Sequence, residues 1–239
     1  NEALRRHFGF EDFLDYQREV VEALLSGLDY CVIMPTGAGK SLCYQLPLLL
    51  KPGYGIVVSP LIALMKDQVD ALRARGIAAG LINSMVDYGE QRETLRAVAA
   101  GEIKLLYVAP ERFDTDHFNR FLEHCPPSAL IVDEAHCISH WGHDFRPAYT
   151  RLGAMAERLH VPQVCAFTAT ATPQVRDDIK VQLRRPAMEF HVAGFKRPNL
   201  AFKVIDCRGG GAKENALAAL LKTPAGPTII YAATRKQVD

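Results

Sequence analysis

Residues 31–41, CVIMPTGAGKS, limit the possible folds more than any other part of the chain. An apolar run ends at Pro35, a short glycine-containing loop follows, and Lys40 and Ser41 open an apolar stretch with helical spacing. This order of strand, glycine loop, Lys-Ser and helix is typical of a phosphate-binding loop (P-loop), whose backbone amides surround phosphate oxygens. The helix start adds free N–H groups and a positive dipole end. The segment therefore predicts a nucleotide site.

The residues expected to surround the phosphates are consecutive: Pro35, Thr36, Gly37, Ala38, Gly39, Lys40 and Ser41. Lys40 is expected to reach the β- and γ-phosphates, and the Ser41 hydroxyl to ligate Mg²⁺. The strict P-loop signature has Gly where this chain has Met34, so this is a looser form of the motif. Gly-Lys-Ser also occurs in ordinary turns, and a second motif is needed to decide.

That second motif is a pair of carboxylates behind another apolar run. Residues 129–132 lead directly into Asp133-Glu134-Ala135-His136. We expect Asp133 to hold Mg²⁺ through water, and Glu134 to orient and deprotonate the attacking water. An Asp-Glu pair also caps ordinary helices. Together with the P-loop, the pair instead predicts hydrolysis of a nucleoside triphosphate, with Lys40, Asp133 and Glu134 as the catalytic residues.

Strands and helices are predicted to alternate after the P-loop. The strands are expected at 31–34, 55–59, 79–82, 104–108, 129–133, 163–168 and 188–193. The helices are expected at 40–50, 62–75, 87–100, 115–124, 148–160 and 173–183, with Pro47 kinking or shortening the first. Most strands are continuous apolar runs, which is typical of burial on both faces. We therefore expect an α/β fold: a parallel sheet flanked by helices, with the site at the carboxyl ends of the strands.

Two further residues are candidates for binding the base. Two helices are expected between residues 4 and 28, and Gln17 lies near the start of the second. A glutamine can bond bidentately to the N6/N7 edge of adenine, and Phe10 could stack on the ring. The alternative is a surface glutamine and a core phenylalanine.

The segment CISHWGHDFRPAY, residues 137–149, has no helical or strand period and is predicted to be a loop. It contains the only tryptophan, Trp141, with Phe145 and Arg146 close by. Aromatic rings beside a cation suit stacking on unpaired bases and a phosphate contact. The alternative is a loop whose aromatic side chains pack on the domain, and this is the expected role of Tyr149. Because the loop follows the carboxylates, whatever it binds could be sensed there.

Composition and charge exclude several classes of protein. A hydrophobic content of 49% and a charged content of 23% are those of a soluble globular chain. No apolar run reaches the roughly 18 residues of a membrane span, and no signal peptide opens the sequence. A net charge of +1 requires any nucleic-acid binding to come from a local patch. The 6 cysteines form no CxxC pair, so we expect no zinc site and a reducing, intracellular setting.

Together these segments resemble the RecQ family of DNA helicases, within helicase superfamily two. MPTGAGKS is similar to motif I, SPLIALMKDQV to motif Ia, DEAH to motif II, FTATAT to motif III and IIYAATRK to motif IV. The start FGFEDF…YQ resembles the adenine-reading motif 0. P-loop and DEAH mark only the superfamily, whereas CISHWGHDFRPAY is the specific signal, because it is similar to the aromatic-rich loop that distinguishes RecQ proteins. The resemblance implies a RecA-like ATP-binding domain over residues 1–194 and the incomplete start of a second one over 195–239.

The resemblance also implies activity, cofactors and partners. Its members use ATP and Mg²⁺ to unwind DNA from 3′ to 5′, acting on single-stranded and partly duplex DNA in repair and recombination. It assigns coupling between nucleotide and DNA to His136, Thr168 and Thr170. Contact with single-stranded DNA falls to Trp141, Phe145 and Arg146.

Two departures from the family pattern have consequences. Leu14 stands where the family usually has Arg, which removes one contact to the nucleotide. Motifs V and VI, with the arginine that completes the site, lie beyond residue 239. Since such an arginine contributes about 10³- to 10⁵-fold in rate, we expect this chain to bind ATP but to hydrolyse it poorly.

The last part of the chain is expected to begin the second domain. A strand at 200–205, a glycine-rich linker at 208–211, a helix at 213–222 and a strand at 228–231 are too little for a sheet domain of this kind. Two other functions stay open at this stage. One is an RNA-directed ATPase of the same superfamily, because base stacking tolerates either sugar. The other is a non-enzymatic module whose binding is controlled by ATP.

Overall fold

The computed structural model describes residues 1–14, 16–142, 144–194, 200–222 and 226–234. These residues divide into two units, one up to residue 194 and one from residue 200, and each is described by itself. Arg235 and Lys236, the end of the segment that resembles motif IV, lie outside the described residues. His143 of the predicted loop lies outside them as well.

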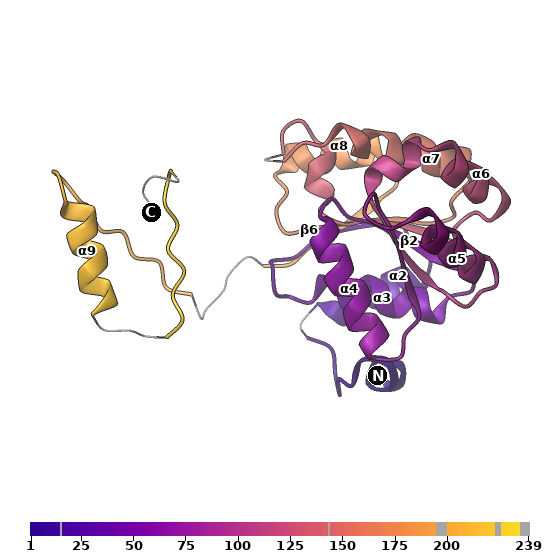
Figure 1. The fold of residues 1–239 in the computed structure, drawn as a ribbon, viewed down its shortest axis with the longest axis horizontal. Coiled ribbons are helices and arrows are strands. Elements are labelled where there is room, and N and C mark those ends of the chain that lie inside the picture. Colours follow the sequence, from indigo (N-terminus) through magenta and orange to yellow (C-terminus); the bar gives the residue numbers. More distant parts are fainter. Residues whose placement is uncertain (15, 143, 195–199, 223–225, 235–239) are drawn as a thin grey trace. The chain divides into compact units, whose positions relative to one another are not determined.

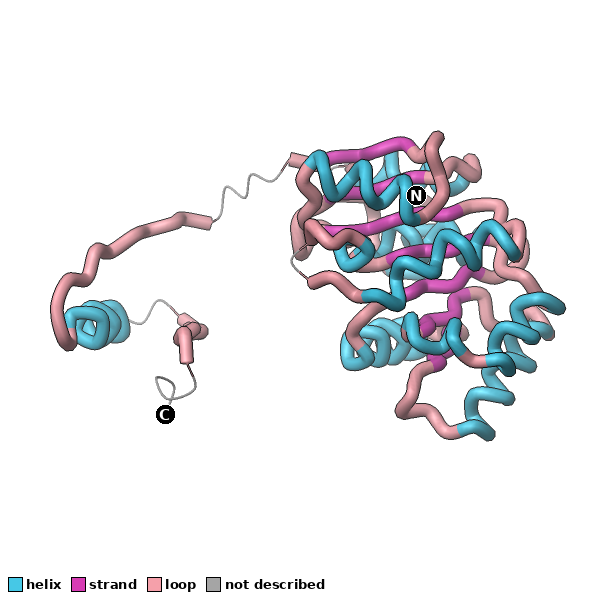
Figure 2. Tube along the Cα trace, turned by 90° about the horizontal axis from the view of Figure 1, so that it is seen from above, coloured by secondary structure: helices cyan, strands magenta, loops and turns pink. Residues whose placement is uncertain are grey.

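The first unit is built on one parallel sheet, which lies between layers of helices (Figures 1 and 2). The sheet has seven strands in the order β3-β4-β2-β5-β6-β1-β7. The strands are β1 (Tyr30–Ile33), β2 (Gly55–Val58), β3 (Ala79–Ile82), β4 (Leu105–Val108), β5 (Ala129–Val132), β6 (Val164–Thr168) and β7 (Glu189–Val192). Each predicted strand of this unit is confirmed, with its ends moved by one residue at most. The α/β class and the parallel sheet are therefore confirmed.

Helices cover both faces of this sheet (Figure 1). One face carries α1 (Glu2–Phe8), α2 (Gln17–Leu25), α3 (Lys40–Leu50) and α4 (Ile62–Ala74). The other carries α5 (Tyr88–Ala99), α6 (Asp116–His124), α7 (Leu152–Arg158) and α8 (Pro173–Gln182). Along β1, Cys31 and Ile33 enter one core while Tyr30 and Val32 enter the other, as the period of two requires. This burial on both faces explains why the strands are continuous apolar runs.

Two helical predictions need correction. Pro47 does not shorten α3, which continues past it to Leu50. The single helix expected at 148–160 is instead a 3-10 turn, Pro147–Arg151, followed by the shorter α7. Proline at the first position fixes φ for such a turn and has no N–H to leave unpaired, which explains the tight start. A second 3-10 turn, Ala135–Ile138, lies in the segment between the carboxylates and the aromatic loop.

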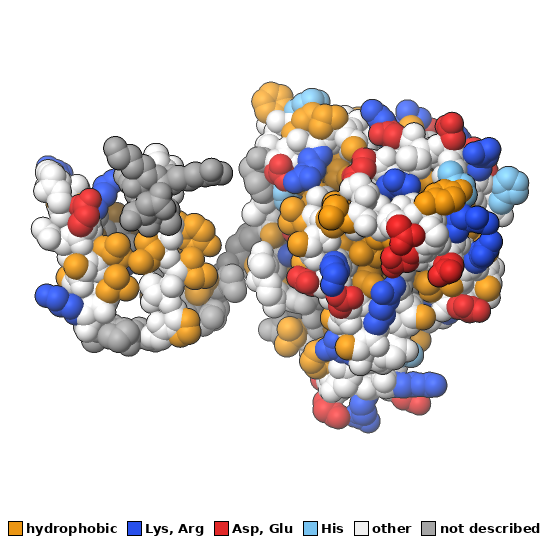
Figure 3. All heavy atoms as spheres, in the orientation of Figure 1, with side chains coloured by type: hydrophobic (Ala, Val, Ile, Leu, Met, Phe, Trp, Pro, Cys, Tyr) orange, Lys and Arg blue, Asp and Glu red, His pale blue; other side chains and the backbone are white. Residues whose placement is uncertain are grey.

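In the second unit only the helical prediction is confirmed, as α9 (Ala212–Leu221). The strands expected at 200–205 and 228–231 are wrong: neither segment forms a strand. Their apolar side chains are exposed, with Phe202 and Val204 at 94% and Tyr231 at 90%. A strand is stable only with neighbours to pair and an apolar face to bury, and the described residues of this unit provide neither. Apolar side chains are accordingly visible on its surface (Figure 3).

Charge is mixed over the visible face of the first unit, where Lys and Arg side chains lie among Asp and Glu (Figure 3). None of the helices in the described residues is long and apolar enough to span a membrane.

Candidate nucleotide site

The P-loop joins β1 to α3 in the order that the sequence predicts. The N–H of Met34 donates to the carbonyl of Thr168 at 3.1 Å and so extends the pairing of β1 with β6. Gly37 and Gly39 then adopt left-handed backbone, with φ of +84° and +75°, where a side chain would be strained. The helix begins directly at Lys40. The first-turn amides of α3 therefore face the loop, as binding of an anion requires.

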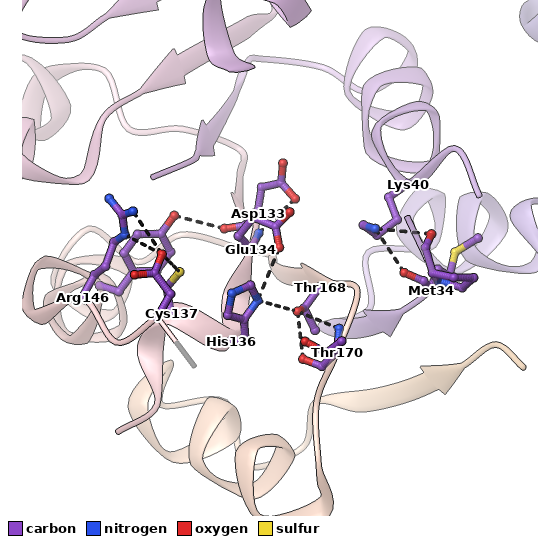
Figure 4. A network of polar contacts seen from close by, with 12 residues as sticks. Met34, Lys40, Asp133, Glu134, His136, Cys137, Arg146, Thr168 and Thr170 are labelled. Carbon is purple, nitrogen blue, oxygen red and sulfur yellow. Dashed lines mark hydrogen bonds and ion pairs between the residues drawn. The ribbon is translucent and has the colours of Figure 1, made fainter. Parts of the chain in front are cut away.

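The ammonium group of Lys40 forms hydrogen bonds with backbone carbonyls of the loop. Its Nζ donates to the carbonyl of Met34 at 3.1 Å and to that of Pro35 at 3.5 Å. Burial lowers the pKa of Lys40, while the carboxylates of Glu134 and Asp133 act in the opposite direction. Lys40 thus lies within electrostatic range of both carboxylates, although β6 separates their strands. Figure 4 shows these groups at one edge of the sheet.

Asp133 lies immediately after β5, and it is buried. Its N–H donates to the carbonyl of Val58 at 2.8 Å, which holds the residue against β2. Burial, with the charge of neighbouring Glu134, raises the pKa of Asp133 to about 6. A nearby cation would favour its ionised form, so the position suits a carboxylate that faces a metal.

Glu134 has left-handed backbone, with φ of 48° and ψ of 46°. Such backbone in a non-glycine residue is sparsely populated and concentrates at functional sites. The N–H of Glu134 donates to Oδ1 of Asp133 at 3.0 Å, which supports the turn. The strained turn sets the directions of two successive carboxylates.

A chain of polar contacts joins the ends of β5 and β6 (Figure 4). Nδ1 of His136 lies 2.9 Å from Oγ1 of Thr168 and 3.3 Å from Oε2 of Glu134. The Thr168 hydroxyl donates to the carbonyl of Thr170 at 3.1 Å, so we assign the hydrogen of this contact to Nδ1 of His136. The structure therefore brings together Glu134 and all three residues expected to couple nucleotide to DNA.

The aromatic loop presents its three predicted DNA residues differently. Trp141 is 68% exposed. Phe145 is half-buried and stacks on His140, with ring centroids 3.6 Å apart. Arg146 is also half-buried, donating to Oδ2 of Asp144 at 3.0 and 3.2 Å and to the carbonyl of Pro60 at 3.0 Å. Only Trp141 of the three is presented openly, while the other two support the loop.

A cavity of about 410 Å³ lies between this loop and the segment that joins β6 to α8. Its lining includes Trp141 from the loop, His136 from the carboxylate segment and Thr170 from the segment after β6. The candidate stacking residue and two candidate coupling residues therefore border the same space.

Tyr149 is fully buried, which confirms its expected packing role. Its hydroxyl also donates to the backbone carbonyl of Asp133 at 3.1 Å. The end of the aromatic loop is thereby bonded to the segment that carries the carboxylates. Nothing in the sequence pattern indicates this bond, because it depends on how the two segments pack.

Gln17 is 2% exposed and bonds to backbone at both ends of its amide. Its Oε1 accepts from the N–H of Leu14 at 2.8 Å, and its Nε2 donates to the carbonyls of Ala38 at 3.1 Å and Gly39 at 3.4 Å. In this structure Gln17 ties the N-terminal segment to the P-loop.

A cavity of about 400 Å³ lies beside Gln17. Its lining is mainly apolar: Phe13, Leu14, Tyr16, Met34, Pro35, Ala38, Ala193 and Gly194. Phe10, the predicted stacking residue, is 49% exposed and is not part of this lining. The sequence reasoning passed over Phe13 and Tyr16, whose only signal was their place in the same aromatic N-terminal segment.

The comparisons with known proteins agree with this geometry. The protein family described as DEAD/DEAH box helicase matches residues 14–179. The chain belongs to the DEAD/DEAH box helicase family. Within it, the expected resemblance to RecQ helicases is confirmed.

Three relatives illustrate that resemblance. ATP-dependent DNA helicase RecQ of Pasteurella multocida is 44% identical over 205 residues, which are 86% of this chain and 32% of that protein. ATP-dependent DNA helicase RecQ of Bacillus subtilis is 44% identical over an alignment 241 positions long, which covers 99% of this chain and 40% of that protein. ATP-dependent DNA helicase Q5 of Rattus norvegicus is 47% identical, covering 84% of this chain and 22% of that protein. The chain thus spans less than half the length of these relatives.

Solved structures share the fold. A hypothetical ATP-dependent RNA helicase from Sulfolobus tokodaii matches with a TM-score of 0.63 and 20% identity, over 80% of this chain and 56% of that one. The DUF1998 helicase MrfA matches with a TM-score of 0.74 and 18% identity, over 99% of this chain and 38% of that one. At these identities the likeness shows the fold alone.

The residues of this family member also fit a magnesium ion. The Ser41 hydroxyl and the Asp133 carboxylate supply hard oxygen ligands at the loop and at the end of β5, and Mg²⁺ prefers such ligands with several waters retained. The described residues contain no cluster of three or more His, Cys, Asp or Glu side chains that could hold a metal. The donor set therefore suits a cation shared with phosphates better than an all-protein cage.

Proposed function

We propose that this chain is the ATP-binding lobe of a RecQ-type helicase that unwinds DNA from 3′ to 5′. The observation that carries the proposal is the polar chain from Thr170 through Thr168 and His136 to Glu134, beside a cavity that the exposed Trp141 also lines. It offers a physical route from a bound strand to the hydrolytic carboxylate. A role in DNA repair and recombination, and hence an intracellular location, follows from this proposal.

In the proposed hydrolytic step, the residues at the carboxyl ends of β1 and β5 each have a separate role. The loop amides and Lys40 bind the phosphates, and Lys40 exchanges the carbonyls of Met34 and Pro35 for phosphate oxygens. Ser41 and Asp133 would hold Mg²⁺, which would supply charge neutralisation at the phosphates. Glu134 orients the attacking water and accepts its proton.

DNA acts on this step through the aromatic loop. Trp141 stacks on an unpaired base, which is a contact that requires no particular sequence. The loop is bonded to Asp133 through Tyr149 and lines one cavity with His136. A strand that shifts the loop therefore changes the position of the His136 ring against Glu134, and with it the water-activating carboxylate.

A second lobe completes the site in this proposal. An arginine from that lobe stabilises the charge of the transition state, with an effect of about 10³- to 10⁵-fold on the rate. We expect residues 1–239 alone to bind ATP with Mg²⁺ and to hydrolyse it slowly.

The deciding experiment is Trp141→Ala in the full-length protein. We expect ATP binding and basal hydrolysis to persist and stimulation by single-stranded DNA to be lost, because stacking contributes about 1–3 kcal/mol per base. Tyr88→Ala, which removes a ring 61% exposed on α5, is the matched control. Unchanged stimulation in Trp141→Ala would contradict the proposed coupling. Stronger stimulation by RNA than by DNA would favour the RNA-directed alternative.

A further inference from the structure

Tyr44 lies where the P-loop helix meets the middle of the sheet. It follows Ser41 by three positions, so both residues face the same side of α3. Its side chain is fully buried, and its ring packs edge-on against Phe167 of β6, with centroids 5.1 Å apart and planes at 70°. Since β6 separates β1 from β5, the Tyr44 ring lies between the strand of the P-loop and the strand of the carboxylates.

The hydroxyl of Tyr44 is buried and makes no hydrogen bond of 3.5 Å or less in the described part of the protein. Burial raises the pKa of Tyr44, and the side chains of Tyr107, Asp133 and Ser41 act on it as well. These groups lie close enough for long, weak polar contacts, but none is at the distance of an ordinary hydrogen bond. Two of these three are the residues that fit magnesium. A buried hydroxyl without a partner destabilises a protein, and such a group is usually kept for a ligand, an ordered water or a catalytic role.

Two other buried tyrosines differ from it, Tyr107 in the same core and Tyr54 in the core on the other face of the sheet. The hydroxyl of Tyr107 accepts from Nε2 of Gln45 at 2.8 Å, and the hydroxyl of Tyr54 donates to the carbonyl of Cys125 at 2.6 Å. Both therefore have structural partners. Phenylalanine at position 44 would fill the same space against Phe167 without burying an unpaired polar atom. Packing alone does not account for the tyrosine.

We propose that Tyr44 is a positioning residue of the metal site, whose hydroxyl bonds to a water held between Ser41 and Asp133 when Mg²⁺ is present. This inference rests on the proposed function, because it takes Mg²⁺ and a nucleotide as the ligands. Mg²⁺ retains several of its waters in such sites, so a protein hydroxyl beside them has a partner once the ion is bound. Outer contacts of this kind typically change metal affinity 10- to 100-fold.

The test is Tyr44→Phe, measured on residues 1–239 with a fluorescent ADP analogue in excess Mg²⁺ and again in EDTA. We expect affinity in Mg²⁺ to fall about tenfold while affinity in EDTA is unchanged. We also expect the melting temperature of the unliganded protein to stay the same or rise, because the variant removes an unpaired buried hydroxyl. The control is Tyr54→Phe, which should lower the melting temperature and leave the Mg²⁺ dependence intact.

Three results would overturn the inference. One is an unchanged Mg²⁺ dependence in Tyr44→Phe, and another is an equal loss of affinity in Mg²⁺ and in EDTA. The third is a fall in melting temperature as large as that of Tyr54→Phe, which would show that the hydroxyl has a structural partner. Failure of the proposed function is distinguishable, because the unaltered chain would then show no Mg²⁺-dependent nucleotide binding at all.

Discussion

The two halves of the nucleotide site are held by different kinds of contact. In the loop half, the polar side chains bond to nearby backbone: Lys40 to Met34, and Gln17 to Ala38. In the carboxylate half, side chains from separate segments bond to one another, as His136 does to Thr168. In the proposed function, the loop half exchanges these contacts for phosphate oxygens one by one. In the carboxylate half, each side chain bonds to another side chain of the site. A substitution at one of these residues therefore changes the contacts of the others.

This difference indicates which half of the site should determine nucleotide affinity and which half should couple hydrolysis to DNA. Variants of the loop half should change nucleotide affinity in proportion to the contact removed. Variants of the carboxylate half should leave affinity nearly intact and change the rate or its dependence on DNA. Four variants test this division.

The largest effect is expected for Glu134→Gln in the full-length protein. The amide keeps the shape of the side chain but cannot accept the proton, so the rate of ATP hydrolysis should fall about 10²- to 10⁴-fold. Binding of ATP, followed with a fluorescent analogue, should persist. Glu123→Gln, which alters a surface carboxylate paired with Arg158, is the control. Retained turnover would remove Glu134 from the role of base.

Lys40→Ala should have the next largest effect, and on affinity. Loss of charge-assisted bonds worth about 1.5–3 kcal/mol should weaken ATP binding by about 10- to 100-fold. Calorimetric titration of residues 1–239 measures this directly. Lys66→Ala serves as the control, because Lys66 pairs only with Asp70 on the surface in this structure. If the two variants bind ATP equally well, the loop half does not hold the phosphates.

Thr168→Val should uncouple the halves without disturbing binding. It removes the hydroxyl that contacts His136 and should reduce stimulation of hydrolysis by single-stranded DNA about fivefold, the size of one net hydrogen bond. Thr115→Val removes a hydroxyl that bonds to the carbonyl of Arg112 away from the site and should leave stimulation unchanged. If Thr168→Val lost as much ATP affinity as Lys40→Ala, the carboxylate half would contribute to binding, and the proposed division between the two halves would be wrong.

Gln17→Ala should have an effect as small as that of Thr168→Val, but on nucleotide affinity. Because its amide ties the N-terminal segment to Ala38 and Gly39, its loss should weaken binding about fivefold for ATP and GTP alike. Measuring both nucleotides distinguishes this from contact with the base. A loss confined to ATP would show that Gln17 reads adenine.

Much of the fold could be predicted because its signals are local. Continuous apolar runs between helical patterns indicated every strand of the first unit. The same reasoning failed at 200–205 and 228–231, where apolar residues such as Phe202 remain exposed. Hydrophobicity predicts a strand only where neighbours exist to bury it, and a local pattern does not report its neighbours.

The site residues also fall into those that local sequence motifs predict and those that depend on contacts between distant segments. Lys40, Ser41, Asp133 and Glu134 lie in contiguous motifs, and the parallel topology places all of them at one sheet edge. The bond from Tyr149 to Asp133 and the bond from Arg146 to Pro60 join residues far apart in sequence. Such contacts depend on the packing of loops, for which no periodic signal exists.

The order of the strands also sets how far apart the two halves of the site begin. Ile33 pairs with Thr168, and Val132 with Ala166, so β6 lies between the end of β1 and the end of β5. Neighbouring strands are about 4.8 Å apart, which separates the backbones of β1 and β5 by roughly 10 Å. Since both faces of the sheet are packed, this backbone separation does not adjust to the ligand. A ligand that contacts both the loop and the carboxylates must therefore bridge the end of β6, together with the side chains that reach toward it from either side.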